Sequence, residues 1–289
     1  MVSGRDFLGP YRLVKIVRAG QHCDVWEATK DPDPKRIAVK VLLKQLIKDR
    51  TLVKELRREA EVGVGLKHPS IIDIDEFNFN HELPFLAMEL FSSKNLKQDI
   101  REHSRRVAFY VTEIITQAAQ GLAHLHEKGW VHCDVKPDNF LMSDKGELKL
   151  IDFSIAKKNK KGGGLWKGKL KGTRSYMAPE QIRRKSVDGR CDLYSLGCVM
   201  YELLAGKPPF TGNSPDELLM KHLRAPPPSL GAANNRVTTE FAELIQKVMS
   251  KDREQRPPTM YSFLKEFQSL RVYRTGKKPT SPTPEVPTE

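Results

Sequence analysis

The spacing of apolar residues divides the chain into a strand-rich part and a helical part. Between residues 10 and 90, the segments 11–17, 25–29 and 36–43 are short and rich in β-branched and aromatic residues, which predicts strands. Residues 51–66 instead have the 3.6-residue period of a helix. The apolar face expected for that helix consists of Leu52, Leu56, Ala60 and Val64.

From about residue 95 onward the pattern becomes helical. One long amphipathic helix is predicted by the apolar positions Val107, Val111, Ile114, Ala118, Leu122 and Leu125. Residues 191–206 are apolar nearly all round, as a buried helix should be, and Gly206 with the following prolines should end it. The last fifteen residues hold four prolines and little that could pack. We therefore expect a small β-rich lobe over 1–90, a helical lobe over 91–272, and a disordered proline-rich tail or linker over 273–289.

Composition is ordinary for a globular protein except for the charge. The 289 residues are 39% hydrophobic and carry a formal net charge of +13, which favours anionic partners such as nucleotides, phosphoproteins, nucleic acid or a membrane surface. The four cysteines lack CxxC spacing and flanking histidines, so we expect free thiols in a reducing compartment and no zinc site. No signal peptide or membrane-spanning run is apparent, which predicts a cytoplasmic chain, although it could be cut from a longer anchored protein.

The segment 131–140, VHCDVKPDNF, brings an aspartate, a lysine and an asparagine close together. Phosphoryl transfer needs positioned groups and neutralised charge more than covalent chemistry. Asp134 could accept a proton from a substrate hydroxyl, Asn139 could hold Mg²⁺, and Lys136 could contact the phosphate being moved. The alternative is a polar surface turn, because Lys-Pro-Asp-Asn is also good turn chemistry.

Six further segments of the chain belong to the same pattern. They are IAVK ending at Lys40, LRREAEVGVGLKHPSI containing Glu59, LKLIDFSIA containing Asp152, GTRSYMAPE ending at Glu180, DLYSLG beginning at Asp192, and REQRPP containing Arg256. Together with residues 131–140, they resemble the signature set of the protein kinase family across about residues 10–272. The resemblance implies an α+β, bilobal protein kinase fold, with a β-rich N-lobe containing one helix and a larger helical C-lobe.

The resemblance also implies roles for individual residues. Lys40, paired with Glu59, would orient ATP; Glu61 is the neighbour that could be mistaken for its partner. Asn139 and Asp152 would hold Mg²⁺, and Asp134 would be the base. Glu180 would pair with Arg256. The residues expected around the nucleotide are Gly20, Val25, Ala38, Lys40, Met88, Glu89, Phe91 and Leu141.

Substrate class follows from two further matches. Lys136 after Asp134, together with Thr173, is similar to the serine/threonine branch of the family, in which these residues help to hold the catalytic aspartate. The phrases around residues 172–181 and 191–212 resemble bacterial members of that branch. We therefore expect transfer of the γ-phosphate of Mg-ATP to Ser or Thr of protein substrates, and no nucleic-acid partner.

Two stretches depart from the family pattern. The phosphate-covering loop has Arg18, Gly20 and Cys23 where the family has three glycines, which predicts modest nucleotide affinity, unless Arg18 adds a contact to phosphate. One turn after Glu59, Gly63 stands where a bulky apolar residue is common. Because glycine costs a helix interior up to about 1 kcal/mol relative to alanine, we expect a loosely held helix, ordered by ATP, a regulatory partner or homodimerisation at the N-lobe. The alternative is that a neighbouring side chain fills the gap.

Cys133 replaces the arginine that usually precedes the catalytic aspartate and binds a phosphorylated activation loop. The corresponding segment, from Ala156 to Gly172, contains no Ser, Thr or Tyr and carries seven lysines. We therefore expect activity without activation-loop phosphorylation, and a basic loop that docks acidic substrates or a regulatory partner. A solvated charge run is the alternative.

Two other functions remain open from the sequence. The altered glycine loop would suit a pseudokinase that scaffolds partners through its basic surface. A small-molecule kinase of the aminoglycoside or choline type would also place Asp and Asn in a short catalytic loop. The segments MAPE and DLYSLG favour a platform for protein substrates.

Overall fold

A computed structural model describes residues 7–79, 83–159 and 171–275, without the side chains of residues 33 and 34. Its contacts divide the chain into two compact units, and each is described by itself. The first extends to Ser92 and includes Ile151–Ala156; the second comprises Ser93–Leu150 and the chain from Lys157 onward. The middle of the lysine-rich segment (residues 160–170) and the proline-rich residues 276–289 lie outside the described residues, so expectations for them stay predictions.

The first unit is built on an antiparallel sheet of six strands with the order β1-β2-β3-β4-β6-β5. Its strands are β1 (Phe7–Leu8), β2 (Tyr11–Arg18), β3 (Cys23–Lys30), β4 (Asp33–Leu42), β5 (Ile74–Asn78) and β6 (Phe85–Glu89). The side chains of Tyr11, Val39 and Phe85 are buried in a hydrophobic cluster on this sheet. All three segments expected to be strands are strands, within a few residues at each end.

A single α-helix belongs to this unit, α1 (Arg50–Gly63), preceded by the 3₁₀ turn η1 (Lys44–Leu46). Asp49 caps the helix, because its carboxylate accepts the backbone N–H groups of Thr51 and Leu52. The buried residues of α1 are Leu56, Glu59, Ala60, Val62 and Gly63. The expectation for Val64 was wrong: it follows the helix in extended conformation and is 42% exposed.

Gly63 lies where two other chain segments of the first unit approach the helix closely. A Cβ built on it would collide with Cδ1 of Ile74 and would lie 3.3 Å from Phe153. Ile74 is 1% exposed and Phe153 is fully buried, so the space beside the glycine is already filled. The structure therefore favours the alternative of a filled gap over a loosely held helix.

The second unit is mostly helical, with two small sheets of the orders β10-β9-β7 and β11-β8. Its strands are β7 (Lys94–Asn95), β8 (Trp130–Val131), β9 (Phe140–Met142), β10 (Leu148–Leu150) and β11 (Lys157–Lys158). Its helices are α2 (Leu96–Arg101), α3 (Arg105–Glu127), α4 (Pro179–Ile182), α5 (Gly189–Ala205), α6 (Pro215–Arg224), α7 (Leu230–Ala233), α8 (Thr239–Val248) and α9 (Met260–Gln268). Its 3₁₀ turns are η2 (Pro137–Asn139), η3 (Arg174–Tyr176) and η4 (Arg253–Gln255).

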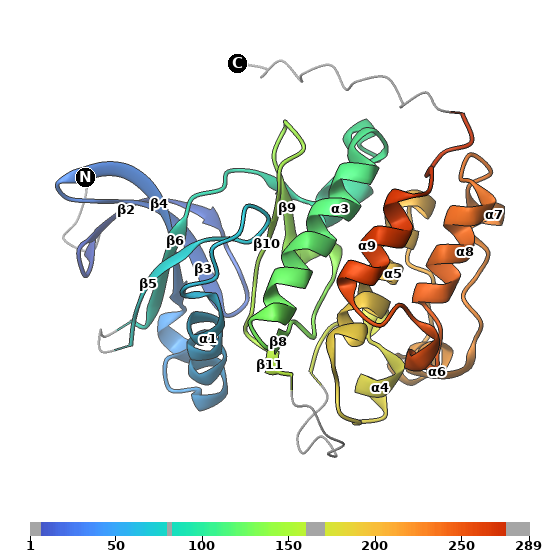
Figure 1. The fold of residues 1–289 in the computed structure, drawn as a ribbon. Coiled ribbons are helices and arrows are strands. Elements are labelled where there is room, and N and C mark those ends of the chain that lie inside the picture. Colours follow the sequence, from blue (N-terminus) through green and yellow to red (C-terminus); the bar gives the residue numbers. More distant parts are fainter. Residues whose placement is uncertain (1–6, 80–82, 160–170, 276–289) are drawn as a thin grey trace. The chain divides into compact units, whose positions relative to one another are not determined.

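Helix α5 forms the centre of the second unit. Every residue from Cys191 to Leu204 is buried, which matches its apolar composition on all sides. Gly206 ends the helix in the left-handed conformation, with φ +72°, as its position predicted. Helices α3 and α9, far apart in sequence, run side by side (Figure 1) and both contact α5.

The two units give the α+β class that the sequence predicted, with the strands of the larger sheet and one α-helix in the first and most helices in the second. The second unit continues past Val272, because Tyr273 forms a β-bridge with Val237 and the Arg274 N–H donates to Arg236 O at 2.9 Å. Within residues 7–79, 83–159 and 171–275, none of the helices is both long and apolar enough to cross a membrane.

The packing at Gly63 gives a testable result. Gly63→Ala should lower the free energy of unfolding by about 1–3 kcal/mol, because overpacking outweighs the gain of up to about 1 kcal/mol in helix propensity. Urea denaturation would measure it. Ile74→Val removes the nearest methyl group, so Gly63→Ala should be less destabilising in that background. A stabilising Gly63→Ala in the wild-type background would contradict this account of the packing.

Candidate functional site

Lys40 and Glu59 form an ion pair inside the first unit. Lys40 lies on β4 and Glu59 on the buried face of α1, and Lys40 Nζ is 2.6 Å from Glu59 Oε2. The Glu59 side chain is only 4% exposed and that of Lys40 20%. Glu61 faces away and pairs with Arg58 at 2.8 Å. The structure thus contains the predicted pair and distinguishes Glu59 from its neighbour.

Asp152 adds a second carboxylate near Lys40. Burial alone would lower the pKa of Lys40, but the charges of Glu59 and Asp152 outweigh it and raise that pKa above its usual value. Asp152 has a left-handed backbone with φ +67°, and its Oδ1 accepts the N–H of Ser154 at 3.2 Å. The charges of two carboxylates, those of Glu59 and Asp152, thus act on the Lys40 ammonium group.

The loop between β2 and β3 keeps one essential glycine. A Cβ on Gly20 would collide with the carbonyl oxygen of Cys23, so this turn requires glycine, and the Gly20 N–H donates to Asp24 Oδ1 at 3.2 Å. Cys23 is half-buried, and burial raises the pKa of its thiol to about 11 although the charge of Lys40 lowers it. Arg18 is exposed, opposite Val25 across the strand pair.

The residues predicted to surround the adenine come from several elements. Ala38 lies opposite Met88 in the β4–β6 pair and both are buried. Glu89 ends β6; its N–H donates to Asp73 O at 2.9 Å and its side chain accepts the Asp73 N–H at 2.8 Å. Half-buried Val25 and Phe91 also belong to the first unit, whereas half-buried Leu141 lies on β9 of the second.

The Asp134 carboxylate is held by two groups of the second unit. Its Oδ1 accepts the backbone N–H of Thr173 at 2.7 Å, and its Oδ2 lies 2.7 Å from Lys136 Nζ. Lys136 also donates to Thr173 Oγ1 at 2.9 Å. The structure therefore brings three predicted site residues together, and the Asp134 carboxylate has one fixed orientation.

Asn139 is oriented by the same loop. Its amide nitrogen donates to the backbone carbonyl of Asp134 at 2.9 Å, which leaves the amide oxygen as the group that could bind a metal. In the described part of the chain, no cluster of three or more His, Cys, Asp or Glu side chains could hold a metal ion. A magnesium ion would therefore need oxygens from a ligand besides Asn139 or Asp152, as Mg²⁺ bound to nucleotide phosphates has.

Cys133 stands directly before Asp134, where the family usually has an arginine. It is 3% exposed and has a left-handed backbone with φ +67°. Its N–H donates to Asp192 Oδ1 at 2.8 Å, and its carbonyl accepts Gln181 Nε2 at 2.9 Å. Burial and the neighbouring Cys133 raise the pKa of the Cys191 thiol, and both cysteines are buried and form no disulfide.

Asp192 supports this loop from inside α5. Besides the Cys133 N–H, its carboxylate accepts the His132 N–H at 2.7 Å and the ring of His126 at 2.8 Å. Asp192 is fully buried. Hydrogen bonds to a charged group contribute about 1.5–3 kcal/mol each, so this carboxylate dominates the local energetics of residues 132 and 133.

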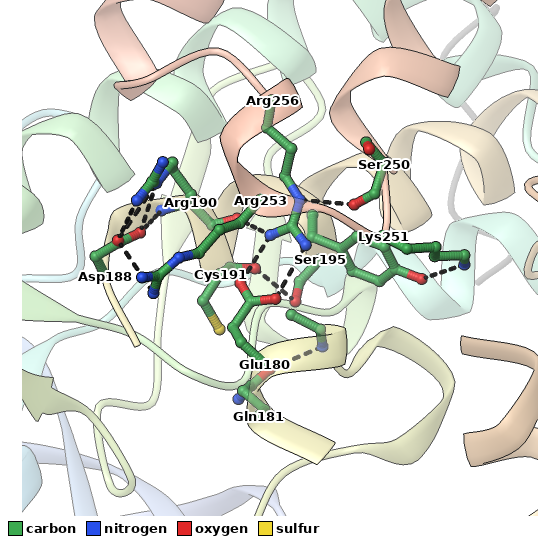
Figure 2. Close-up of polar contacts among 12 residues, drawn as sticks. Glu180, Gln181, Asp188, Arg190, Cys191, Ser195, Ser250, Lys251, Arg253 and Arg256 are labelled. Atoms are coloured by element: carbon green, nitrogen blue, oxygen red, sulfur yellow. Dashed lines mark hydrogen bonds and ion pairs between the residues drawn. The ribbon is translucent and has the colours of Figure 1, made fainter. Parts of the chain in front are cut away.

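A second buried charge pair fixes the segment after Thr173. Arg256 binds Glu180 with two parallel hydrogen bonds, Nη1 to Oε1 at 2.7 Å and Nη2 to Oε2 at 2.9 Å (Figure 2). Arg256 also donates to the carbonyls of Ser250 and Arg190, so its guanidinium is fully engaged. The pairing of Glu180 with Arg256 was predicted and is confirmed.

Sequence reasoning listed Asp192 as a motif position but gave it no role, and it missed Gln181 entirely. Both act on backbone groups of residue 133, about fifty to sixty positions away, and no local pattern shows such partners. The one indication was an aspartate, Asp192, inside the otherwise apolar segment 191–206.

The sequence matches the protein kinase domain family over residues 11–267. It is 32% identical over 278 residues to the serine/threonine-protein kinase PknB of Mycobacterium tuberculosis, covering 94% of this chain and 44% of PknB. It is 31% identical over 289 residues to PknA of the same species, covering 98% and 66%. A probable serine/threonine-protein kinase of Streptomyces coelicolor, SCO3848, is 30% identical over 262 residues, covering 89% and 39%. The chain thus spans less than half the length of PknB.

Proposed function

Because the chain belongs to the protein kinase family, we propose that it transfers the γ-phosphoryl group of Mg-ATP to Ser or Thr hydroxyls of protein substrates. The observation that carries the proposal is the arrangement at Asp134, whose carboxylate is oriented by the Thr173 N–H and by Lys136. A base must be held in reach of the hydroxyl proton that it accepts, and a fixed carboxylate meets that requirement. The Lys136–Thr173 contact supports the serine/threonine branch.

In this proposal each residue has one task. Asp134 accepts the proton as the substrate hydroxyl attacks the γ-phosphorus and the bond to the β–γ bridging oxygen breaks, which releases ADP. Lys136 steadies the transferred group, and Lys40, held by Glu59, binds the phosphates of ATP. Bound Mg²⁺ neutralises the negative charge that develops on the phosphate oxygens. The amide oxygen of Asn139 and the carboxylate of Asp152 are suited to hold it.

The residues of the proposed nucleotide pocket also follow from the match to the protein kinase family. Gly20 provides the close turn over the phosphates, and Val25, Ala38 and Leu141 contact the adenine ring. Glu89 and Phe91 bind its edge, and Met88 closes the rear of the pocket. Cys23 and Arg18 in the loop reduce its freedom relative to glycine, which supports modest ATP affinity.

We further propose that the site does not depend on a phosphorylated activation segment. The backbone of Cys133 is held by Asp192 and Gln181, which need no phosphate. The described ends of the segment also bind near the catalytic loop: Lys157 and Lys158 pair with β8, and Thr173 binds Asp134. Acidic protein substrates would complement the lysines between Ala156 and Gly172.

Substitutions in the second unit separate this function from that of a pseudokinase. Asp134→Asn should lower kcat by about 10²–10⁴-fold, because the amide cannot accept the proton. Asp138→Asn changes the same loop at a residue without an assigned role, and its kcat should stay within about threefold of wild type. The kcat is measured as the transfer of labelled phosphate from ATP to a generic basic protein. No transfer by the wild-type protein, with ATP bound, would support the pseudokinase instead.

Phosphatase treatment tests the independence from phosphorylation. The kcat/KM on a peptide should change by less than about tenfold, equivalent to roughly 1.4 kcal/mol. Mass spectrometry must confirm complete dephosphorylation. A larger fall that is reversed by rephosphorylation of Thr173 or Ser175 would refute the proposal.

A further inference from the structure

The loop after α4 presents three consecutive cations, Arg183, Arg184 and Lys185, which we name the basic loop. All three side chains are exposed, and none forms an ion pair with any described residue. The neighbouring acidic residues are already engaged: Glu180 binds Arg256, and Asp188 binds Arg190 at 2.9 Å and lies 3.6 Å from Arg253. Among the described residues, none therefore pairs with the positive charges of this loop.

The backbone of the basic loop favours glycine, yet the chain has arginine there. Arg184 has a left-handed conformation with φ +54°. Its N–H donates to Gln181 O at 3.0 Å and the Lys185 N–H donates to Glu180 O at 2.9 Å, which is the hydrogen-bond pattern that ends a helix with glycine in the left-handed position. A side chain at this position destabilises the fold. Arg184 thus places an exposed cation on a backbone that glycine would adopt with less strain.

The basic loop is also held rigidly. The Arg256–Glu180 pair fixes its start, and Arg253 Nη1 donates to Ser186 O at 3.0 Å just after its end. A rigid arrangement of cations loses little conformational freedom when it binds an anionic partner.

Lys251 adds a further cation to this region (Figure 2). Its Nζ donates to Tyr194 Oη at 3.1 Å and lies 4.3 Å from the centre of the Phe210 ring. Burial, together with the positive charges of Arg256 and Arg183, lowers the pKa of Lys251 to about 8.

A hollow of about 660 Å³ begins directly beside the basic loop. Ser186 and Val187, which follow Lys185, form part of its wall. The rest of the lining is mixed: Pro258, Met260 and Tyr261 contribute apolar atoms, whereas Glu127, Asp188, Arg190 and Arg253 contribute charged groups. A ligand with an apolar group next to its negative charges could therefore use both features.

We propose that the basic loop docks an acidic polypeptide segment of a protein substrate, with an apolar side chain of that segment entering the adjacent hollow. The proposal deepens the proposed kinase function and rests on it for the identity of the partner as a substrate. Complementary charge and a polypeptide-sized hollow favour an acidic peptide over nucleic acid, which offers charge but no aliphatic side chain.

Binding can be measured without catalysis. A labelled peptide with an Asp/Glu cluster and one Phe, but no Ser, Thr or Tyr, is titrated with the full chain at low and at high salt, and fluorescence anisotropy gives Kd. The double variant Arg183→Gln/Lys185→Gln should weaken binding at least tenfold at low salt and reduce the salt dependence. The matched control Lys145→Gln/Lys207→Gln removes the same charge from exposed positions elsewhere and should change Kd less than twofold.

The variant Arg184→Gly should change stability and peptide binding in opposite directions. It should raise Tm, because it removes the strained side chain, and it should weaken peptide binding about threefold, equivalent to about 0.6 kcal/mol. Transfer to a short peptide without an acidic segment should be unchanged. Equal losses in the two double variants, unchanged binding by Arg183→Gln/Lys185→Gln, or tighter binding of single-stranded nucleic acid of equal charge at the same residues would overturn the proposal. Absence of phosphoryl transfer by the wild-type chain would refute the kinase function. The Kd measurements would still test the docking surface, because they do not depend on catalysis.

Discussion

The buried carboxylate of Asp192 is the interaction on which the candidate site depends most. It accepts hydrogen bonds from two successive backbone N–H groups, those of His132 and Cys133, and so fixes the residues immediately before Asp134. The left-handed turn at Cys133 is unfavourable for a residue with a side chain, and it persists because its N–H and carbonyl are both bound in the interior. An uncompensated buried charge would be costly, whereas these donors and His126 satisfy it.

These contacts within the second unit also underlie the proposal that Asp134 is positioned without a phosphorylated residue. The catalytic loop is bound by Asp192 of α5, by Gln181 and by Thr173, so folding of this unit sets the geometry of the loop. A cysteine is well suited to position 133, because a small apolar side chain fits the interior, whereas an arginine there would need solvent or an anion.

Much of the fold and several of the pairs could be predicted from the sequence because their determinants are local or belong to family motifs. The spacing of apolar residues predicted α1 and α3, the nearly all-apolar segment 191–206 predicted α5, and the family motifs predicted the Lys40–Glu59 and Glu180–Arg256 pairs. Contacts between distant segments could not be read in this way. Nothing near Gly63 indicates that Ile74 fills the space beside it, and a run of three cations gives no sign that Arg184 occupies the position of a glycine.

The most direct test of this account is the turnover of Asp192→Asn in fully dephosphorylated protein. Asparagine has nearly the same size, but its amide offers one acceptor oxygen and places an N–H₂ group against backbone donors. We predict that kcat on a peptide falls more than about a hundredfold, equivalent to roughly 2.7 kcal/mol, while circular dichroism shows a folded protein. A kcat within about threefold of the wild-type value would contradict the claim that this buried carboxylate, without phosphorylation, orders the catalytic loop.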